Sequence, residues 1–363
     1  MAELLQVRNL VKHFPVRRGF FRSRQEYVHA VDGISFSLDA EQTMGLVGES
    51  GCGKSTAGRA ILRLIRPTSG AVRFKGEDIL AMETGRMMRV RRQVQMIFQD
   101  PFGSLNPRLT VERIVEEPLT THRVGKTGER RERVAEILHT VGLLPEHMTR
   151  FPHEFSGGQR QRIMIARALI LQPELIICDE PVSALDVSVQ AQIINLMVRL
   201  QRRYRFSYII ISHDLSVIRH VSHKVAVMYL GQIVEMAPAA DLFRSPLHPY
   251  TLALLSAVPV PDPHRKRQRI ILSGDVPSPL RPPAGCRFHP RCPQRMVVCE
   301  RRAPAMRLID PHHIVACHLH TDGPEWHLSA PGTTTRTAGQ PGEPARHDSA
   351  AVRPATHKKE VQS

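Results

Sequence analysis

The chain has 363 residues with 42% hydrophobic and 5% aromatic content, and its formal net charge is +16. Its length predicts one large domain and one smaller one, and its longest apolar runs, such as residues 208–211, are too short to cross a membrane. The start MAELLQVRNL lacks a secretory signal, so we expect a cytosolic protein, whereas the positive charge alone fits nucleic acid, an anionic membrane or a solvated surface.

Four regions follow one another along the chain, and the last, from about residue 246, is rich in proline and contains four cysteines. Short strands are predicted in the first region at residues 4–7, 34–38, 44–47, 72–75 and 94–98. From about residue 110 to residue 170 the chain is rich in helix formers, and apolar residues recur at helical spacing at Val134, Ile137, Leu138 and Val141. Buried-strand patterns return at 175–178, 207–211 and 225–229, with a helical stretch at 187–203. This alternation predicts an α/β fold whose mainly parallel sheet is interrupted by a helical insert.

The sequence GESGCGKST, residues 48–56, follows the apolar run at 44–47 and has the spacing of a phosphate-binding loop. Glycines let successive backbone N–H groups point into one concave anion site, and the helix that begins near Lys54 adds its positive end. Lys54 would contact the β- and γ-phosphates, and the Ser55 hydroxyl would contact Mg²⁺. A simple glycine-rich turn is disfavoured, because every fixed position is filled. We expect nucleotide contacts from Gly48, Glu49, Ser50, Gly51, Cys52, Gly53, Lys54, Ser55 and Thr56.

A second nucleotide motif is the strand at 175–178, which runs into Asp179 and Glu180. Carboxylates at the C-terminal end of a strand lie where open α/β sheets bind ligands. Asp179 would hold Mg²⁺ through water, and Glu180 would orient or deprotonate the attacking water. A strand followed by acids is common, so this assignment depends on the phosphate loop that precedes it.

The stretch SGGQRQR, residues 156–162, resembles the signature of ATP-binding cassette (ABC) transporter ATPases. In that family the signature, here Ser156, Gly157, Gly158 and Gln159, caps a helix whose positive end meets the γ-phosphate held by a partner subunit. A serine cap and two glycines again make an anion site, ahead of a helix expected over 159–170. This second site cannot share the first one's nucleotide, which implies two chains around two ATP molecules. Phe155 stands where the family commonly has Leu.

Other positions also resemble this family, in the expected order. Gln99 matches the glutamine that reaches Mg²⁺ and water, Asp186 matches the D-loop aspartate, and His213 matches the histidine that contacts the γ-phosphate. Phe14 lies where the family places a ring against adenine, with Tyr27 as a rival. The resemblance implies an ABC-type P-loop ATPase domain over 1–245, with a mainly parallel core, an antiparallel β subdomain and a helical subdomain at about 100–170.

The sequences LHPYTLALLSAVPVPDP, LSGDVPSPLRPPAGCRFHPRCP and VACH resemble the extension of dipeptide and oligopeptide importer ATPases. The resemblance covers residues 4–320 and assigns the extension to 246–322; residues 323–363 are expected to be a disordered tail. It is closest to the F-type ATPase, which pairs with a D-type chain, two transmembrane permeases and a periplasmic or extracellular binding protein. This implies a peripheral location at the cytoplasmic face of the membrane and no nucleic acid. Nickel or opines, the cargo of related importers, stay open.

Four cysteines in the extension have the spacing C-x5-C-x6-C-x17-C: Cys286, Cys292, Cys299 and Cys317. Disulfides are not expected in the cytosol, and zinc sites favour closer pairs. Four thiolates suit a 4Fe-4S cluster, which some importers of this type carry, with zinc or no metal as alternatives. We expect the cluster to stabilise an extension that has little core of its own. Cluster loss should loosen residues 280–320 before it affects ATP binding at Lys54, which we expect to lie in a separate core. The remaining two cysteines, Cys52 and Cys178, are interpreted as packing residues.

A different class of function also fits part of this pattern. The net charge would suit a soluble ABC ATPase that acts on nucleic acid or ribosomes. Such relatives usually carry two cassettes or a large insertion, whereas this chain has one compact cassette. A cassette without catalysis is opposed by the presence of Lys54, Asp179, Glu180 and His213.

Overall fold

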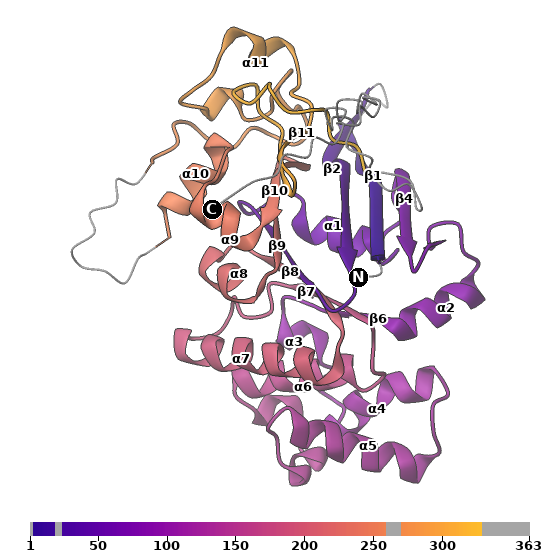
Figure 1. The fold of residues 1–363 in the computed structure, drawn as a ribbon. Coiled ribbons are helices and arrows are strands. Elements are labelled where there is room, and N and C mark those ends of the chain that lie inside the picture. Colours follow the sequence, from indigo (N-terminus) through magenta and orange to yellow (C-terminus); the bar gives the residue numbers. More distant parts are fainter. Residues whose placement is uncertain (1–2, 19–23, 259–269, 329–363) are drawn as a thin grey trace, which may run out of the picture. The chain divides into compact units, whose positions relative to one another are not determined.

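A computed structural model describes residues 3–18, 24–258 and 270–328, which belong to one compact unit that ends at Leu328. The larger of its two sheets has the strand order β11-β12-β10-β9-β3-β8-β7-β6 (Figure 1). Its strands are β3 (Thr43–Val47), β6 (Val94–Ile97), β7 (Leu175–Asp179), β8 (Ser207–Ser212), β9 (Lys224–Tyr229), β10 (Gln232–Pro238), β11 (Arg307–Asp310) and β12 (His313–Val315). Most of the predicted tail lies outside the described residues.

The five strands from β9 to β6 are parallel to their neighbours, and β10, β12 and β11 continue the sheet in antiparallel pairing. Every residue of β3, β7 and β8 is buried, as expected for continuous apolar strands that are covered on both faces. The predicted α/β fold with a mainly parallel sheet is therefore confirmed. The last two strands come from the extension, so the extension completes the same sheet.

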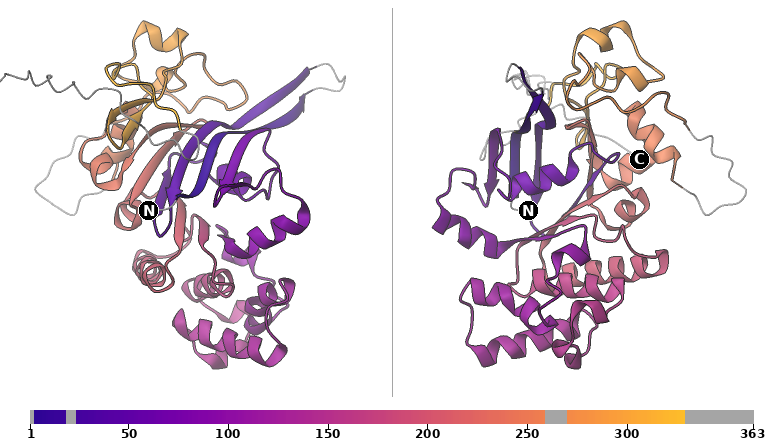
Figure 2. Two further views of the ribbon diagram at one scale, coloured as in Figure 1. Left: turned by 45° about the vertical axis from the view of Figure 1, so that its right-hand side comes forward. Right: turned by 180° about the vertical axis from the view of Figure 1, so that it is seen from behind.

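The smaller sheet is antiparallel, with the order β2-β1-β4-β5. Its strands are β1 (Glu3–Arg18), β2 (Arg24–Asp39), β4 (Ser69–Phe74) and β5 (Glu77–Asp78). The prediction of short strands at 4–7 and 34–38 was wrong in length, because β1 and β2 pair over 16 residues each and extend past β4 (Figure 2). In the outer half of this hairpin, none of residues 11–16 and 25–30 is fully buried, so backbone pairing continues where burial no longer marks the sequence.

The helical insert lies between β6 and β7 in the sequence and contains α3 to α6, with α4, α5 and α6 grouped together in Figure 1. The predicted apolar positions Val134, Ile137, Leu138 and Val141 are buried, so the helical periodicity is confirmed. The α-helices are α1 (Lys54–Ile61), α2 (Thr84–Gln93), α3 (Pro101–Ser104), α4 (Val111–Thr121), α5 (Thr127–Thr140), α6 (Gly157–Leu169), α7 (Val187–Tyr204), α8 (Leu215–Val221), α9 (Ala239–Arg244), α10 (Pro249–Ser256) and α11 (Val297–Arg301). Short 3-10 helices cover Pro145–Thr149, Pro152–Glu154 and His289–Arg291.

The extension packs into the main hydrophobic core. Tyr250 of α10 and Phe288 are fully buried against Tyr229 of β9, with ring centroids 4.7 and 5.3 Å from the Tyr229 ring. The extension therefore has little core of its own, as expected. The expected separation from the core around Lys54 is incomplete, because Ile314 of β12 lies in the same buried cluster as Ala57 of α1. Local sequence patterns could not predict this packing, because the three rings are far apart in the sequence and meet only in the folded chain.

A buried carboxylate joins the extension to the main sheet. Glu235 of β10 accepts hydrogen bonds from the backbone N–H groups of Leu247 and His248, at 2.7 and 3.0 Å, and pairs with His313 of β12 at 2.7 Å. Burial opposes its ionisation, but the hydrogen bonds from His313 and from the backbone hold the pKa of Glu235 below its usual value. Glu235 thus holds the start of α10 and strand β12 together.

Acid should destabilise the fold through His248. The buried His248 ring accepts the Tyr250 N–H at Nδ1, 3.0 Å away, and burial lowers the pKa of His248 from 6.5 to about 4. Between these two pH values the unfolded chain binds more protons than the folded chain, so stability falls as the pH falls. We expect His248 to contribute a loss of about 2 kcal/mol in unfolding free energy between pH 7 and pH 5, measured by chemical denaturation.

The matched control is His248→Asn, because asparagine can still accept a hydrogen bond at a helix start but does not titrate. This variant should lose about 2 kcal/mol less than the unmodified chain between pH 7 and pH 5. Equal losses in the two proteins would show that His248 does not carry the effect.

Candidate functional site

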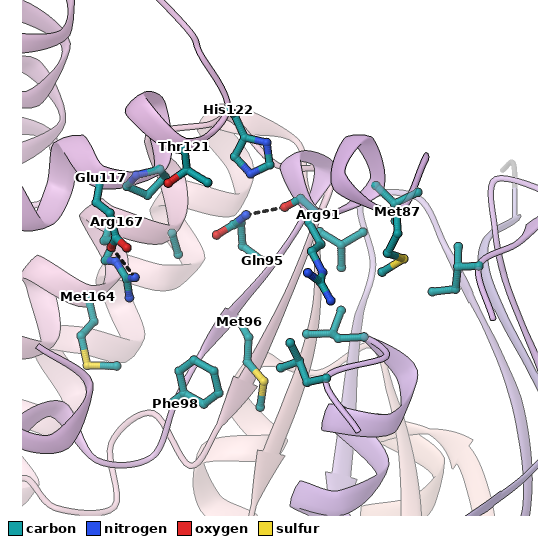
Figure 3. Close-up of a pocket in the computed structure, with 17 residues that line it drawn as sticks. Met87, Arg91, Gln95, Met96, Phe98, Glu117, Thr121, His122, Met164 and Arg167 are labelled. Atoms are coloured by element: carbon teal, nitrogen blue, oxygen red, sulfur yellow. Dashed lines mark hydrogen bonds and ion pairs between the residues drawn. The ribbon is translucent and has the colours of Figure 1, made fainter. Parts of the chain in front are cut away.

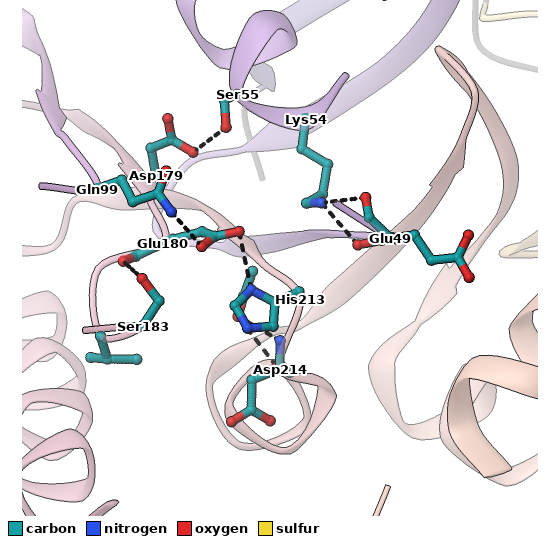
Figure 4. A network of polar contacts seen from close by, with 12 residues as sticks. Glu49, Lys54, Ser55, Gln99, Asp179, Glu180, Ser183, His213 and Asp214 are labelled. Carbon is teal, nitrogen blue, oxygen red and sulfur yellow. Dashed lines mark hydrogen bonds and ion pairs between the residues drawn. The ribbon is translucent and has the colours of Figure 1, made fainter. Parts of the chain in front are cut away.

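The loop between β3 and α1 has a shape that requires glycine at two positions. Gly48 (φ 152°) and Gly53 (φ 105°) lie in the left-handed region, and a Cβ would approach Met228 O to 2.2 Å and Ala30 O to 1.9 Å, respectively. The Lys54 side chain is buried, and its Nζ donates hydrogen bonds to Gly48 O and Glu49 O at 2.8 and 2.9 Å (Figure 4). The loop therefore holds an ammonium group over its own concave backbone.

Ser55 and Asp179 form the second part of the site. The Ser55 hydroxyl donates to Asp179 Oδ1 at 2.6 Å, and the Arg59 guanidinium lies 3.6 Å from Oδ2. Burial raises the pKa of Asp179, against the lowering effect of the Ser55 hydrogen bond. Oδ2 is buried and, within the described part of the chain, accepts no hydrogen bond. A hydroxyl beside a carboxylate with a spare oxygen is a donor set that suits Mg²⁺.

Gln99, Glu180 and His213 meet at the C-terminal ends of neighbouring parallel strands (Figure 4). Gln99 Nε2 donates to Glu180 Oε2 at 2.9 Å, and His213 Nδ1 lies 3.1 Å from Glu180 Oε1. Glu180 has φ 49°, and its N–H donates to Ile211 O of β8 at 2.9 Å. The Glu180 carboxylate is thus fixed from both sides, in a position where it can orient a water molecule.

These groups surround one cavity of about 560 Å³. Phe14, Val28 and Ala30 of the hairpin line it together with the phosphate loop, Gln99, Glu180 and His213. Tyr27, the rival of Phe14, is not among the lining residues, and the Lys12 ammonium lies 4.7 Å from the Phe14 ring centroid.

Pro279 of the extension also lines this cavity, and its carbonyl accepts the His29 N–H of β2 at 2.9 Å. Nothing in the sequence signalled this role, because Pro279 lies within a proline-rich stretch without a motif.

The signature residues lie elsewhere. Ser156 caps α6, since its hydroxyl accepts the Gln159 N–H at 3.3 Å while Gln159 Oε1 accepts the Ser156 N–H at 3.0 Å. The helix begins at Gly157, and a Cβ on Gly158 would lie 2.5 Å from Val189 of α7. Neither the signature nor Asp186, at the start of α7, lines the cavity. Within one chain, therefore, the signature does not meet the phosphate loop.

The four cysteines of the extension lie close enough together to influence one another's ionisation. Burial raises the pKa of Cys286, Cys292 and Cys317, the last to about 11, and the neighbouring thiols add to each shift. Their sulfurs face the backbone N–H groups of Phe288, Gln294 and Leu319, and Cys299 Sγ accepts the Met296 N–H at 3.5 Å. Among the described residues, no three of these sulfurs lie within 4.8 Å of one another.

The extension contacts the hairpin at a cluster that the sequence did not reveal. Atoms of His13, His29 and Asp32 that could bind a metal lie within 4.8 Å of one another, with His13 Nε2 2.9 Å from Asp32 Oδ1. Arg287 of the extension pairs with the other oxygen of Asp32 and donates to Leu230 O. The Asp32 carboxylate is therefore already neutralised, and the cluster joins the extension to β2.

Comparison with known proteins agrees with this geometry. Residues 31–183 match the family described as ABC transporter, and residues 234–299 match the family described as oligopeptide/dipeptide transporter, C-terminal region. The chain is 54% identical to the oligopeptide transport ATP-binding protein AppF of Bacillus subtilis. The aligned 321 residues cover 88% of this chain and 98% of AppF. It is 48% identical to the di/tripeptide transport ATP-binding protein DppF of Pseudomonas aeruginosa, covering 88% and 98%.

Solved structures of similar fold are also ATP-binding cassettes. The dimeric post-hydrolysis structure of the cassette MJ0796 bound to ADP and Pi matches with a TM-score of 0.58 and 27% identity, over 65% of this chain and 99% of that one. CbiO1 of Clostridium perfringens, part of the transporter complex cbiONQ, matches with a TM-score of 0.57 and 26% identity, over 68% and 92%. In the described part of this chain, no helix combines the length and hydrophobicity that a membrane crossing requires.

Proposed function

The chain belongs to the family of ABC transporter ATP-binding proteins, and from this membership we propose that it powers the import of dipeptides or oligopeptides through a membrane transporter. The observation that carries the ATPase assignment is the meeting of Lys54, Ser55 and Glu180 around one cavity, with Asp179 hydrogen-bonded to Ser55. The peptide cargo is supported by the match over 234–299 and by the names of the relatives. These names favour import over action on nucleic acid or ribosomes, and nickel or opines remain the alternative cargo.

The side chains of the cavity have separate roles in this mechanism. The phosphate loop and Lys54 bind the triphosphate, and Phe14 contacts the adenine. Ser55 and Asp179, with Gln99, would hold Mg²⁺, which neutralises phosphate charge when bound. Glu180 orients the attacking water and takes up its proton, while the hydrogen bonds from Gln99 and His213 fix the carboxylate.

The signature implies a second ATPase subunit. Because Ser156 lies outside the cavity of its own chain, it can serve only a nucleotide that is held by a partner. We infer a heterodimer in which this chain is the F-type subunit and a D-type ATPase completes both sites. Two permeases and a binding protein outside the cytoplasm complete the transporter, with the ATPases at the cytoplasmic face of the membrane.

The isolated chain should therefore hydrolyse ATP slowly, and addition of the D-type subunit and the permeases should raise the rate roughly tenfold or more, because each site then gains the opposing signature. In the assembled complex, Ser156→Arg should lower hydrolysis while ATP affinity at this chain's own Lys54 site stays unchanged. Steady-state hydrolysis and equilibrium ATP binding measure the two effects. An isolated chain that already turns over at the rate of the complex would contradict the shared site.

The permease contact is proposed at Gln99–Leu109, beside an apolar groove of about 250 Å³ (Figure 3). The groove lies between α2 and β6 on one side and α4 and α6 on the other, with Met87, Phe98 and Met164 among its lining residues. Leu109 is 39% exposed. A crosslinker at Leu109 should reach a permease in the assembled complex, and crosslinks found only far from this loop would contradict the placement.

We further propose that Cys286, Cys292, Cys299 and Cys317 hold a 4Fe-4S cluster, with zinc as the alternative. Sulfurs that share one tetrahedral zinc ion lie about 3.8 Å apart, given a Zn–S distance of about 2.3 Å. Among the described residues, no three of these sulfurs lie that close, and a cluster would accept a wider arrangement because each thiolate binds its own iron. Backbone N–H groups directed at the sulfurs would stabilise thiolates. When bound, a cluster would crosslink the segment and supply folding energy.

A further inference from the structure

Glu49 places a carboxylate inside the phosphate loop, one residue after Gly48. Its side chain is turned away from Lys54 (Figure 4) and forms a two-pronged ion pair with Arg291 of the extension. Arg291 NH1 lies 2.7 Å from Glu49 Oε2, and NH2 lies 3.1 Å from Oε1. The Arg291 side chain is only 9% exposed, so this pair is shielded from water on the side of the extension.

The backbone of the same residue is held by a second group of the extension. The Glu49 N–H donates to the Tyr250 hydroxyl at 2.8 Å. Tyr250 is fully buried, and its ring packs between Tyr229 and Phe288, with centroids 4.7 and 5.4 Å away. A hydroxyl on such a ring has little freedom to move, so it fixes the peptide that opens the phosphate loop.

The negative charge of Glu49 would oppose ATP binding if Arg291 did not neutralise it. A carboxylate within an anion-binding loop repels the triphosphate, and this repulsion is strong where water is excluded. A guanidinium bound through two parallel hydrogen bonds neutralises the carboxylate and also fixes its direction. Removal of Arg291 would leave an unpaired, partly buried negative charge on the phosphate loop.

From these contacts we infer that Arg291 and Tyr250 of the extension are positioning residues that hold the phosphate loop in its ATP-binding shape through Glu49. The inference rests on the proposed ATP site. It assigns the extension a part in nucleotide binding, in addition to its place in the sheet. Arg291 directly precedes Cys292, and the Cys286 N–H donates to Cys299 O at 2.8 Å. The arginine that holds the phosphate loop therefore belongs to the segment that carries the cysteines.

The test compares two arginines of the extension that both pair with a glutamate of the body of the chain. Arg291→Met should weaken ATP binding about tenfold and raise KM for ATP by a similar factor, with kcat changed less than about twofold in the assembled complex. Arg281→Met is the control, because Arg281 pairs with Glu26 of the hairpin at 2.5 Å and is 72% exposed. This control should bind ATP like the unmodified chain.

A second substitution that removes the charge of Glu49 distinguishes a positioning role of Arg291 from a general role in folding the extension. Adding Glu49→Gln to Arg291→Met removes the unpaired carboxylate, so ATP affinity should recover to within about threefold of the unmodified chain. If Arg291 only folded the extension, the second substitution would leave the defect in place, and that result would overturn the inference. Unchanged affinity in Arg291→Met would overturn it as well.

A second variant covers the case in which Arg291→Met does not fold. Tyr250→Phe keeps the packed ring and removes only the hydroxyl that accepts the Glu49 N–H, so ATP affinity should fall about threefold with unchanged stability of the extension. Unaltered affinity would count against the inference. The unmodified chain and Lys54→Ala serve as reference proteins: if the unmodified chain did not bind ATP, the proposed function itself would fail, whereas normal binding with unaffected variants would remove only the role of the extension.

Discussion

Glu180→Gln should lower ATP hydrolysis about a hundredfold or more while ATP still binds. Glutamine keeps the size of the side chain but lacks the charge that attracts and deprotonates water. In the structure, both carboxylate oxygens are engaged, Oε2 by Gln99 and Oε1 by His213, so the group is held at a fixed position at the edge of the cavity. The measurement is steady-state hydrolysis in the assembled transporter, together with equilibrium binding of ATP.

Lys54→Ala gives the contrasting defect. Lys54 belongs to the loop that we propose to hold the phosphates, so its loss should weaken ATP binding itself. Glu180→Gln should instead leave the dissociation constant within about threefold of the unmodified protein. The pair of variants therefore separates binding from chemistry. Near-normal turnover of Glu180→Gln in a complete complex would remove Glu180 from its assigned role.

Local sequence patterns predicted the centre of the site because local geometry determines it. The phosphate loop needs glycine at Gly48 and Gly53 for steric reasons, and Asp179 and Glu180 follow a strand whose neighbours end at the same edge. The capping of α6 by Ser156 is likewise contained within a few residues. In each case the spacing in the sequence fixes the geometry.

Long-range contacts account for what the sequence did not predict. The ion pair between Glu49 and Arg291 joins residues that are 242 positions apart in the sequence. Pro279 lines the cavity but belongs to a stretch without a helical or strand pattern. Strands β11 and β12 are short, and their addition to the sheet beyond β10 depends on the tertiary fold. The packing of the extension depends on such contacts too, since Phe288 meets Tyr229 only in the folded chain.

Replacing any one of Cys286, Cys292, Cys299 or Cys317 by serine should abolish iron binding. If the cluster is present, anaerobically purified protein should be brown and contain about four irons per chain, and each of these variants should be colourless. Cys52→Ser and Cys178→Ser are the matched controls, because these two buried cysteines lie in the nucleotide motifs and should leave the colour unchanged. Visible absorbance and metal analysis measure the result.

The contacts of Arg291 change the expected consequence of losing the cluster. Cluster loss should expose residues 280–320 to protease, since ligation would supply part of their folding energy. Because Arg291 precedes Cys292 and pairs with Glu49, ATP affinity should fall along with protease resistance, as in Arg291→Met. Colourless anaerobic protein with one zinc per chain would show that the cysteines hold a zinc ion instead of a cluster. Protein without metal would show that they form no metal site. Protease sensitivity with unchanged ATP affinity would separate the cysteines from the phosphate loop.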